Sequence, residues 1–352
     1  MAKAAILKTS LDVLYYSGAS QVLRGIFGGI GAIFMLHHVK PGGGLQSGFA
    51  PNSGLEVTPE FLDAVIRLVK ARGFDLVAMD EAVARIANEE KAARPFAVFT
   101  LDDGYRDNLV HALPVFRKNG CPFTIFVAPA ISDGTCELWW RGLEAVIAGT
   151  HHVEAAIGGE TISLYTVSDA QKQLAWQRIY WPLRLMDQRR QRVWIREFCA
   201  RQGVDLEAMC RAEAMTWDEV RTIAAEPLCT IGAHTIHHYA IGQLSEAAAR
   251  EEIVASAARI EKELGKRPKF FAYPYGDPQS AAQRDFELVK EAGYTAAVTT
   301  RKGLVFSGHK DHLLALPRVS LQGGYQKLRY TDVLLSGTAF ALLNGFRRVN
   351  AD

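Results

Sequence analysis

Residues 95–105 read PFAVFTLDDGY, a strand-length apolar run that ends in two carboxylates and a glycine. Short apolar runs with β-branched or aromatic residues are typical of buried strands. Because neighbouring side chains on a strand point to opposite faces, Asp102 and Asp103 diverge at its end, and Gly104 lets the chain turn sharply. Such a pair can place one carboxylate on a metal and use the other as a base, or it can cap the helix that follows.

Seven more runs of this kind occur along the chain, and helical segments separate them. They are Gly31–Val39, Phe74–Met79, Phe123–Ala128, Leu228–Ala233, Phe270–Tyr275, Ala296–Thr299 and Leu314–Leu321. Strands that alternate with helices at this spacing indicate βα units around a parallel sheet. With seven or eight strands, the pattern favours an α/β barrel over an open sheet.

The segments between the runs carry helix start and stop signals. Pro59–Ala71 follows Thr58, an N-cap residue, and has Pro at its first position and Glu60 in its first turn. Further helices are expected over Asn108–Asn119, Ser245–Leu264 and Pro278–Ala292, each near a glycine that stops it.

The stretch from 134 to 215 interrupts this alternation. It is rich in Trp, Arg and Gln and has helical periodicity, with Thr161–Tyr165 as its one candidate strand. We expect a helical insertion in a barrel loop, where insertions often shape a substrate cleft; a lid or an oligomer contact is the alternative. The expected division is an N-terminal helix over 1–30, a barrel over 31–322 and a C-terminal helix or tail over 323–352.

Composition narrows the class of protein. The 352 residues include 40 Lys and Arg against 38 Asp and Glu, a formal net charge of +2. A nucleic-acid binder would usually be strongly basic, so no nucleic-acid partner is expected. The five cysteines form no CxxC pair, which favours buried or free thiols in a reducing compartment.

The two ends of the chain bear on location. Charged residues interrupt the apolar N-terminal segment, which indicates an amphipathic helix over Leu7–Ile26 rather than a signal peptide. The apolar stretch Val333–Phe346 is 14 residues long, too short to span a bilayer as a helix of ~20 residues. We expect it to dock on the domain, with a peripheral membrane contact through Arg347 and Arg348 as the alternative. A cytoplasmic location is expected.

A second polar motif follows the run that ends at Ala233. Residues 231–238 read IGAHTIHH, and His234 and His238 are four apart, a spacing that places both imidazoles on one side of a helical turn. A lone histidine usually carries no function, but three in five residues are unusual. With Asp103, His234 and His238 complete a set of two histidines and one carboxylate. Such a set leaves coordination positions of the metal open for water and substrate. The ligand types predict a divalent metal, zinc first.

Two further strand ends carry candidate groups. Residues 270–276 read FFAYPYG, and the proline could aim the backbone N–H of Tyr275 at a developing oxyanion, although this motif taken alone favours a simple aromatic-rich turn. Residues 34–39 read FMLHHV, and one of His37 and His38 is a candidate general acid because histidine titrates near neutral pH.

The blocks TLDDG, HTIHH and YPYG, in this order, resemble the three principal motifs of the NodB-homology polysaccharide deacetylases, carbohydrate esterase family 4. The resemblance covers about 32–322, with 134–215 unmatched. It implies a distorted (β/α) barrel and metal-dependent removal of N- or O-acetyl groups from sugars. It also implies that Asp102 is the base, that Asp103, His234 and His238 bind the metal, and that the Tyr275 N–H stabilises the oxyanion.

The chain departs from this pattern at two places. The family's third block usually begins with an Arg that holds the base, and Ala272 stands there; the late Leu-x-His block that supplies the acid has no clear counterpart. The block around His37 is similar to rearranged members, such as the biofilm poly-N-acetylglucosamine deacetylases, whose acid comes from the first strand. This implies His37 as the acid, with His38 as its rival, and we predict that Arg318 replaces the missing Arg.

The substrate follows from the same resemblance. The expected contacts are Tyr105, Trp217 and Pro274, and five tryptophans (Trp139, Trp140, Trp176, Trp181 and Trp217) could stack on sugar rings, Trp217 foremost. The near-neutral charge suits an uncharged acetylated poly- or oligosaccharide. Two alternatives stay open: a deacylase acting on a non-sugar amide, and a barrel that binds glycans without catalysis. The oligomeric state stays undetermined.

Overall fold

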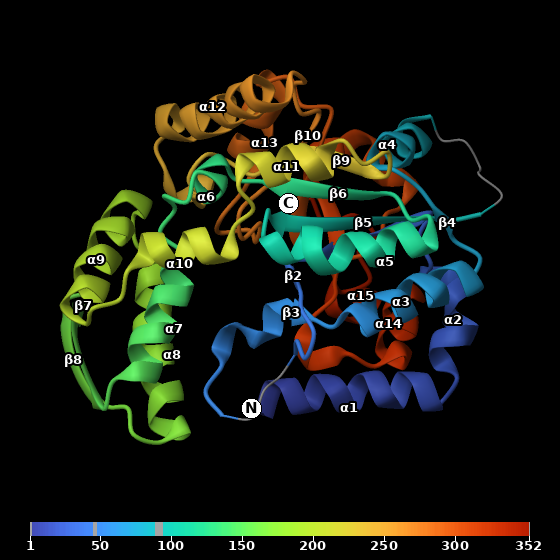
Figure 1. Cartoon of the computed structure of the whole chain (residues 1–352). Coiled ribbons are helices and arrows are strands. Elements are labelled where there is room, and N and C mark those ends of the chain that lie inside the picture. Colours follow the sequence, from blue (N-terminus) through green and yellow to red (C-terminus); the bar gives the residue numbers. More distant parts are fainter. Residues whose placement is uncertain (1, 45–47, 89–93, 352) are drawn as a thin grey trace.

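The computed structural model describes residues 2–44, 48–88 and 94–351 (Figure 1). A closed ring of seven parallel strands forms its centre. In order around the ring these are β1 (Gly31–Leu36), β12 (Leu316–Ser320), β11 (Ala296–Lys302), β10 (Phe270–Ala272), β9 (Cys229–Ala233), β6 (Phe123–Val127) and β5 (Phe96–Asp103). The ring closes because β5 also pairs with β1. The predicted (β/α) barrel of about seven strands is therefore confirmed.

Every predicted strand run contains a strand, although some are shorter than expected. The run at 74–79 forms only β4 (Asp75–Leu76), which pairs with the first residues of β5 as an eighth strand outside the ring. The run at 31–39 breaks after β1, and β2 (His38–Val39) leaves the barrel to pair with β3 (Glu56–Val57). This break places the two predicted histidines at the end of β1.

Side-chain alternation separates the barrel interior from the layer under the helices. Along β5, Phe96 and Val98 belong to the interior cluster, together with Phe126 and Leu316. The intervening residues, such as Phe99, pack outward in the larger cluster beneath the surrounding helices. Successive side chains of a strand point to opposite faces, so the apolar run at 95–101 covers both sides.

The helices around the barrel largely match the predicted ranges. They include α3 (Pro59–Ala71), whose N-cap Thr58 accepts a hydrogen bond from the Phe61 N–H, and α12 (Glu246–Leu264), which ends at Gly265 in the left-handed region. The other covering elements are α4 (Met79–Ala87), α5 (Leu113–Asn119), α11 (Trp217–Ala224) and α13 (Gln283–Glu291).

Three predicted helices differ from those observed. The helix expected over 278–292 begins only at Gln283, because the Asp277 carboxylate accepts hydrogen bonds from the Gln279 N–H and the Ser280 hydroxyl and holds 277–280 in a turn. The first turns of the helix at 108–119 form a π-helical segment, η2 (Asn108–Ala112), before α5. The N-terminal helix is two helices, α1 (Ala2–Tyr16) and α2 (Ala19–Phe27), separated by Gly18 with φ +73°.

The chain between β6 and β9 forms a lobe beside the barrel (green to yellow in Figure 1). Its elements are α6 (Pro129–Ser132), α7 (Trp139–Gly149), the hairpin β7 (His152–Ile157) and β8 (Glu160–Tyr165), α8 (Asp169–Leu185), α9 (Gln188–Arg201) and α10 (Leu206–Glu213). The lobe has its own apolar core, which includes Trp139 and Phe198. Strand β7 was not predicted, although the Gly158–Gly159 pair before the candidate strand at 161–165 is a hairpin signal in the sequence.

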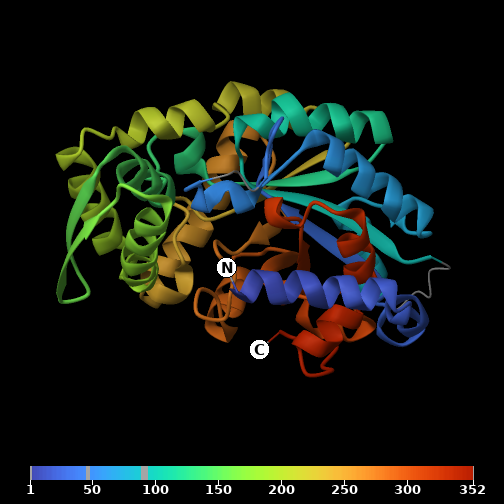
Figure 2. The ribbon, with the colours of Figure 1, turned by 90° about the horizontal axis from the view of Figure 1, so that it is seen from below.

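The two ends of the chain pack together. Figure 2 shows α1 lying along the C-terminal helices, which are α14 (Leu328–Leu335) and α15 (Thr338–Leu343). Leu11 of α1 shares a small buried cluster with Tyr330 and Val333 of α14. Within the described residues, no helix is long and apolar enough to cross a membrane. All five cysteines are free thiols, and four of them are buried.

Candidate active site

The polar ends of the strands meet at the carboxyl edge of the barrel. The register pairs Asp103 of β5 with Val127 of β6, and Val127 with Ala233 of β9. His234, the first residue after β9, therefore lies at the same height along the barrel axis as Asp103. The carboxyl edge is the face where (β/α) barrels place their active sites.

Asp103, His234 and His238 form a buried cluster at this edge. The Nε2 atoms of His234 and His238 lie 3.4 Å and 3.2 Å from Asp103 Oδ1, and one ligand atom from each residue lies within 4.8 Å of the others. All three side chains are at least nine-tenths buried. His234 Nδ1 lies 2.7 Å from the Ala272 carbonyl oxygen, a contact that leaves Nε2 as the ligand nitrogen.

The cluster fits a divalent metal ion. Asp103 Oδ1 is buried without a hydrogen-bond partner, although two imidazole nitrogens face it. Burial lowers the pKa of His238 to about 4, so its imidazole is neutral at pH 7, as a metal ligand must be. Burial tends to raise the pKa of Asp103, but the neighbouring histidines outweigh it and hold that pKa well below its usual range. A carboxylate and two neutral imidazoles suit zinc or a related metal.

His234 and His238 do not lie on a helical turn. Residues 234–238 form an irregular loop after β9, and Thr235 and His238 have φ of +57° and +56°. The prediction that the i, i+4 spacing reflects a helix was therefore wrong. The left-handed residues fold the loop back, so both imidazoles still face Asp103.

Asp102 is held by a buried arginine from the last strand. Arg318 Nη1 and Nη2 donate to Asp102 Oδ1 and Oδ2, both at 2.7 Å, and Arg318 Nη1 also donates to the Thr100 hydroxyl at 3.1 Å. Burial tends to raise the pKa of Asp102, but the charge and hydrogen bonds of Arg318 outweigh it and hold that pKa below its usual value. The structure thus brings Arg318 to the carboxylate that Ala272 cannot reach.

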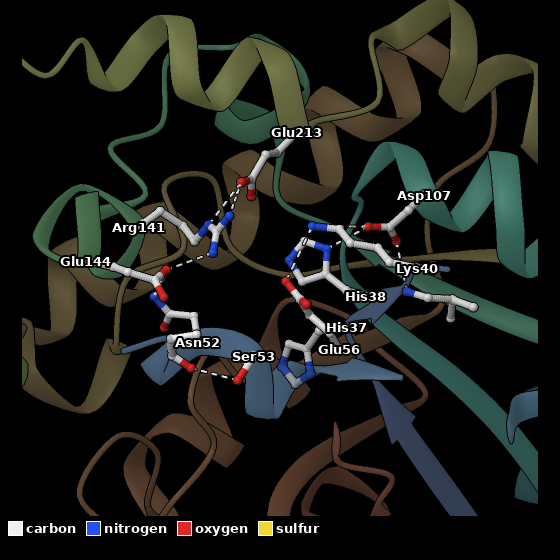
Figure 3. A network of polar contacts seen from close by, with 12 residues as sticks. His37, His38, Lys40, Asn52, Ser53, Glu56, Asp107, Arg141, Glu144 and Glu213 are labelled. Atoms are coloured by element: carbon white, nitrogen blue, oxygen red, sulfur yellow. Dashed lines mark hydrogen bonds and ion pairs between the residues drawn. The ribbon is translucent and has the colours of Figure 1, made fainter. Parts of the chain in front are cut away.

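The neighbouring histidines at the end of β1 point in different directions (Figure 3). His37 lines the cavity, and its Nε2 lies 4.0 Å from Asp102 Oδ2. His38 is buried against the Tyr105 ring, and its Nδ1 lies 2.6 Å from Asp107 Oδ2. Of the two candidate acids, only His37 faces the metal cluster.

The cluster opens into a cavity of about 340 Å³. The lobe supplies Trp139 and Trp140 from α7, and Tyr180, Trp181 and Arg184 from α8. Asn52, from the short helix η1 (Pro51–Leu55), also lines the cavity, and its amide donates to the Trp140 carbonyl and to Glu144 of α7. Figure 3 shows Asn52 beside Glu144. The insertion therefore forms one wall of the cavity.

The predicted substrate contacts lie elsewhere. Trp217 is buried, and its indole donates to Asp133 beneath the Arg259 guanidinium. Tyr105 is fully buried under His38, and neither it nor Pro274 lines the cavity. Tyr275 does line it, with φ +62° and its phenol oxygen 2.7 Å from Trp139 Nε1. Asn52 and Arg184 were missed, since no local pattern marks either residue.

Comparisons with known proteins agree with this geometry. A family model described as polysaccharide deacetylase matches residues 191–297. A 95-residue stretch, 27 % of this chain and 30 % of the relative, is 27 % identical to YxkH of Bacillus subtilis, which is named as a polysaccharide deacetylase. The chain thus matches less than a third of that relative's length.

Solved structures share the fold. The deacetylase PplD of Streptococcus pyogenes, in complex with acetate, has a TM-score of 0.54 and 16 % identity over 83 % of this chain and 92 % of its own. IcaB from Ammonifex degensii has a TM-score of 0.53 and 17 % identity over 87 % and 96 %. The sequence match at 191–297 contains His234 and His238 but not Asp102 or Asp103. The fold of the barrel brings the two aspartates and the two histidines together.

Proposed function

We propose that this chain, a protein of the polysaccharide deacetylase family, uses a divalent metal ion to hydrolyse acetyl groups from a poly- or oligosaccharide. One observation carries the proposal: the buried cluster of Asp103, His234 and His238 lies beside an Asp102 carboxylate clamped by Arg318. A site with one carboxylate for a metal and one kept ionised has both parts that amide hydrolysis needs.

The residues divide the work of the reaction. A metal held by Asp103, His234 and His238, zinc in our proposal, would polarise the acetyl carbonyl and acidify the attacking water. Asp102, kept ionised by Arg318, accepts the proton that this water loses. The Tyr275 backbone N–H donates to the developing oxyanion, and His37 gives a proton to the leaving amine. Acetate and a free amino sugar are the products.

The cavity wall supports a sugar as the substrate. Trp139, Trp140 and Trp181 line it, and indole faces pack well against the apolar faces of sugar rings. Arg184 lies over the Tyr275 ring and donates to Asp277 at 2.8 Å, so its charge is already paired. This wall suits a neutral N-acetylated sugar better than a small aliphatic amide. The five free thiols support our further proposal of a cytoplasmic location.

The test is a deacetylation screen on zinc-loaded protein whose metal content is measured on the same sample. N-acetylated oligosaccharides, an O-acetylated sugar and small acetamides are offered, and acetate release and mass loss are followed. We expect acetate from the N-acetylated oligosaccharides and about one metal ion per chain. Acetate from the acetamides alone would identify a non-sugar deacylase, and bound glycan without acetate release would identify a binding protein.

A further inference from the structure

An apolar groove of about 360 Å³ adjoins the candidate active site. Its walls come from the terminal helices α1, α14 and α15, and they include Leu7, Leu11, Leu14, Leu334, Phe340 and Leu342. Three residues, Lys302, Ser320 and Gln322, line both this groove and the catalytic cavity. The two spaces therefore lie next to each other at the carboxyl ends of β11 and β12. The groove has the size of a small-molecule site, roughly 300–1,000 Å³.

The groove is open rather than a void in the core. Leu7 and Leu342 on its walls are 43 % and 58 % exposed, and Leu343 beside them is 59 % exposed. Exposed apolar groups that gather beside a cleft are typical of a surface that binds an apolar ligand.

The lining changes from polar to apolar along the line from the catalytic cavity to the groove. The catalytic cavity begins with the metal cluster and the tryptophans, which suit a sugar. The shared residues Lys302, Ser320 and Gln322 are polar, and beyond them most of the groove is lined by leucines and aromatic side chains. An amphiphile with a sugar head, a polar linkage and an apolar chain has the same order of groups.

We propose that the groove binds the apolar chain of the substrate, an acetylated sugar joined to an alkyl or isoprenoid chain. The sugar lies in the catalytic cavity, its linkage passes Lys302, Ser320 and Gln322, and its chain packs against Leu7, Leu14 and Leu342. This inference rests on the proposed function for the sugar end of the molecule. It adds the class of substrate: a glycolipid rather than a free glycan.

The experiment compares two soluble substrates that differ only in chain length, the methyl and octyl glycosides of N-acetylglucosamine. Both are used below the concentration at which the octyl compound forms micelles. Each methylene that becomes buried improves binding by up to about fourfold. We expect KM for the octyl glycoside to be at least about tenfold lower, with kcat little changed, because the chain does not touch the reacting atoms.

Charge substitutions locate the effect. Leu7→Glu and Leu342→Glu place a carboxylate on partly exposed groove walls, so the fold tolerates them, and each should abolish the octyl preference while leaving turnover of the methyl glycoside unchanged. Val13→Glu on α1 and Val22→Glu on α2 are the matched controls, because both side chains are exposed and neither lines the groove. Ala339→Trp, which fills the groove with an apolar group, should act like Leu7→Glu.

The outcomes separate this inference from the proposed function. Equal KM values for the two glycosides, or an octyl preference that survives Leu7→Glu, would overturn the chain-binding role. If the wild type shows no octyl preference and the groove variants lose binding to phospholipid vesicles, the groove is a membrane contact instead. If neither glycoside nor any acetylated sugar of the screen above releases acetate, the proposed function fails. Calorimetric binding of the octyl glycoside by the metal-loaded protein, weakened by Leu7→Glu and not by Val13→Glu, would then still establish the groove.

Discussion

Four residues at the mouth of the barrel hold a backbone conformation that side chains disfavour. Asp103, Thr235, His238 and Tyr275 have φ between +56° and +75°, and just one other non-glycine residue described, Phe346, shares this region. Such conformations cost about 1–3 kcal/mol each and concentrate at functional sites. Simple alternation would turn Asp103 away from Asp102; its left-handed φ brings it to the histidines instead.

Removal of the base should stop catalysis and spare the metal. For Asp102→Asn we expect kcat to fall at least ~100-fold, because the amide cannot accept the proton of the attacking water. Metal content, measured on the same purified sample, should be unchanged, since Asp102 is not in the cluster of Asp103, His234 and His238. Loss of the metal together with activity would instead make Asp102 a ligand.

Replacement of Arg318 should move the pH profile. The guanidinium favours the ionised form of Asp102, so in Arg318→Ala the pKa of that carboxyl rises. Because activity requires the ionised carboxylate, the acid limb of the kcat/KM profile should move to a higher pH than in the wild type. Breaking a buried ion pair also destabilises the fold by about 3–5 kcal/mol, which chemical denaturation would measure.

Arg318→Lys is the matched control for that change. It keeps a positive charge but loses the two parallel hydrogen bonds, so a smaller displacement of the acid limb is expected. If Arg318→Ala leaves kcat and the pH profile intact, Arg318 is not the residue that holds the base.

The two histidines of β1 should behave differently. His37 faces Asp102, whereas His38 is engaged with Asp107. His37→Gln should lower kcat about 10²–10⁴-fold through loss of proton donation to the amine. His38→Gln should mainly reduce thermal stability, and a kcat loss as large as that of His37→Gln would assign the acid to His38. An activated acetate ester, whose leaving group needs no proton, should partly rescue His37→Gln.

At the scale of elements, two helices hold the loop at 234–238 in place. From α12, Glu252 accepts hydrogen bonds from the Ile236 and His237 N–H groups, and its other oxygen lies 2.6 Å from His237 Nδ1. From α9, buried Arg192 donates to the His237 and His238 carbonyl oxygens. The lobe and the barrel thus both position His238, although neither of these contacts is a metal ligand.

Glu252→Gln should weaken metal binding without removing a ligand. The amide lacks the charge and half of the acceptors that hold the loop, so we expect metal affinity to fall about 10–100-fold, as for other residues that orient ligands. Competition with a chromophoric chelator measures this. Glu251→Gln, at the exposed neighbouring position on α12, should leave the affinity unchanged. Equal affinities for both variants would contradict the positioning role of Glu252.

Element boundaries show where local patterns suffice. Helix α3 matches its predicted range because Thr58, Pro59 and an amphipathic pattern all act within a few residues. The start of α13 was wrong because the Asp277 side chain, which also binds Arg184 of the lobe, stabilises a turn instead. The loop at 234–238 was wrong for a similar reason: its conformation depends on Glu252 and Arg192, which lie outside it.

At the scale of the whole molecule, metal binding should stabilise the folded protein. Asp103, His234 and His238, the proposed ligands, come from two strand ends that meet only in the closed barrel, so the unfolded chain lacks the site. A ligand at 100 times its Kd then contributes about 2.7 kcal/mol. We expect chelation to abolish acetate release and lower Tm, and added zinc to restore both. His234→Ala is the control: its Tm should not respond to chelator or zinc, whereas an unchanged wild-type Tm would argue against the cluster.

The order of strands, most helices and the three polar blocks follow from the sequence alone, because alternation, caps and motif spacing act over a few residues. Arg318 as the residue that holds Asp102 was also predicted from the sequence, and the structure pairs the two. The different directions of His37 and His38, and the identity of the tryptophans that line the cavity, required the tertiary structure. Trp217 shows why: its position beside the histidine block suggested the cleft, yet its indole faces Asp133. Side-chain direction across a closed barrel depends on register and packing between segments that are distant in sequence, and the apolar groove arises only where the two chain ends meet beside β12.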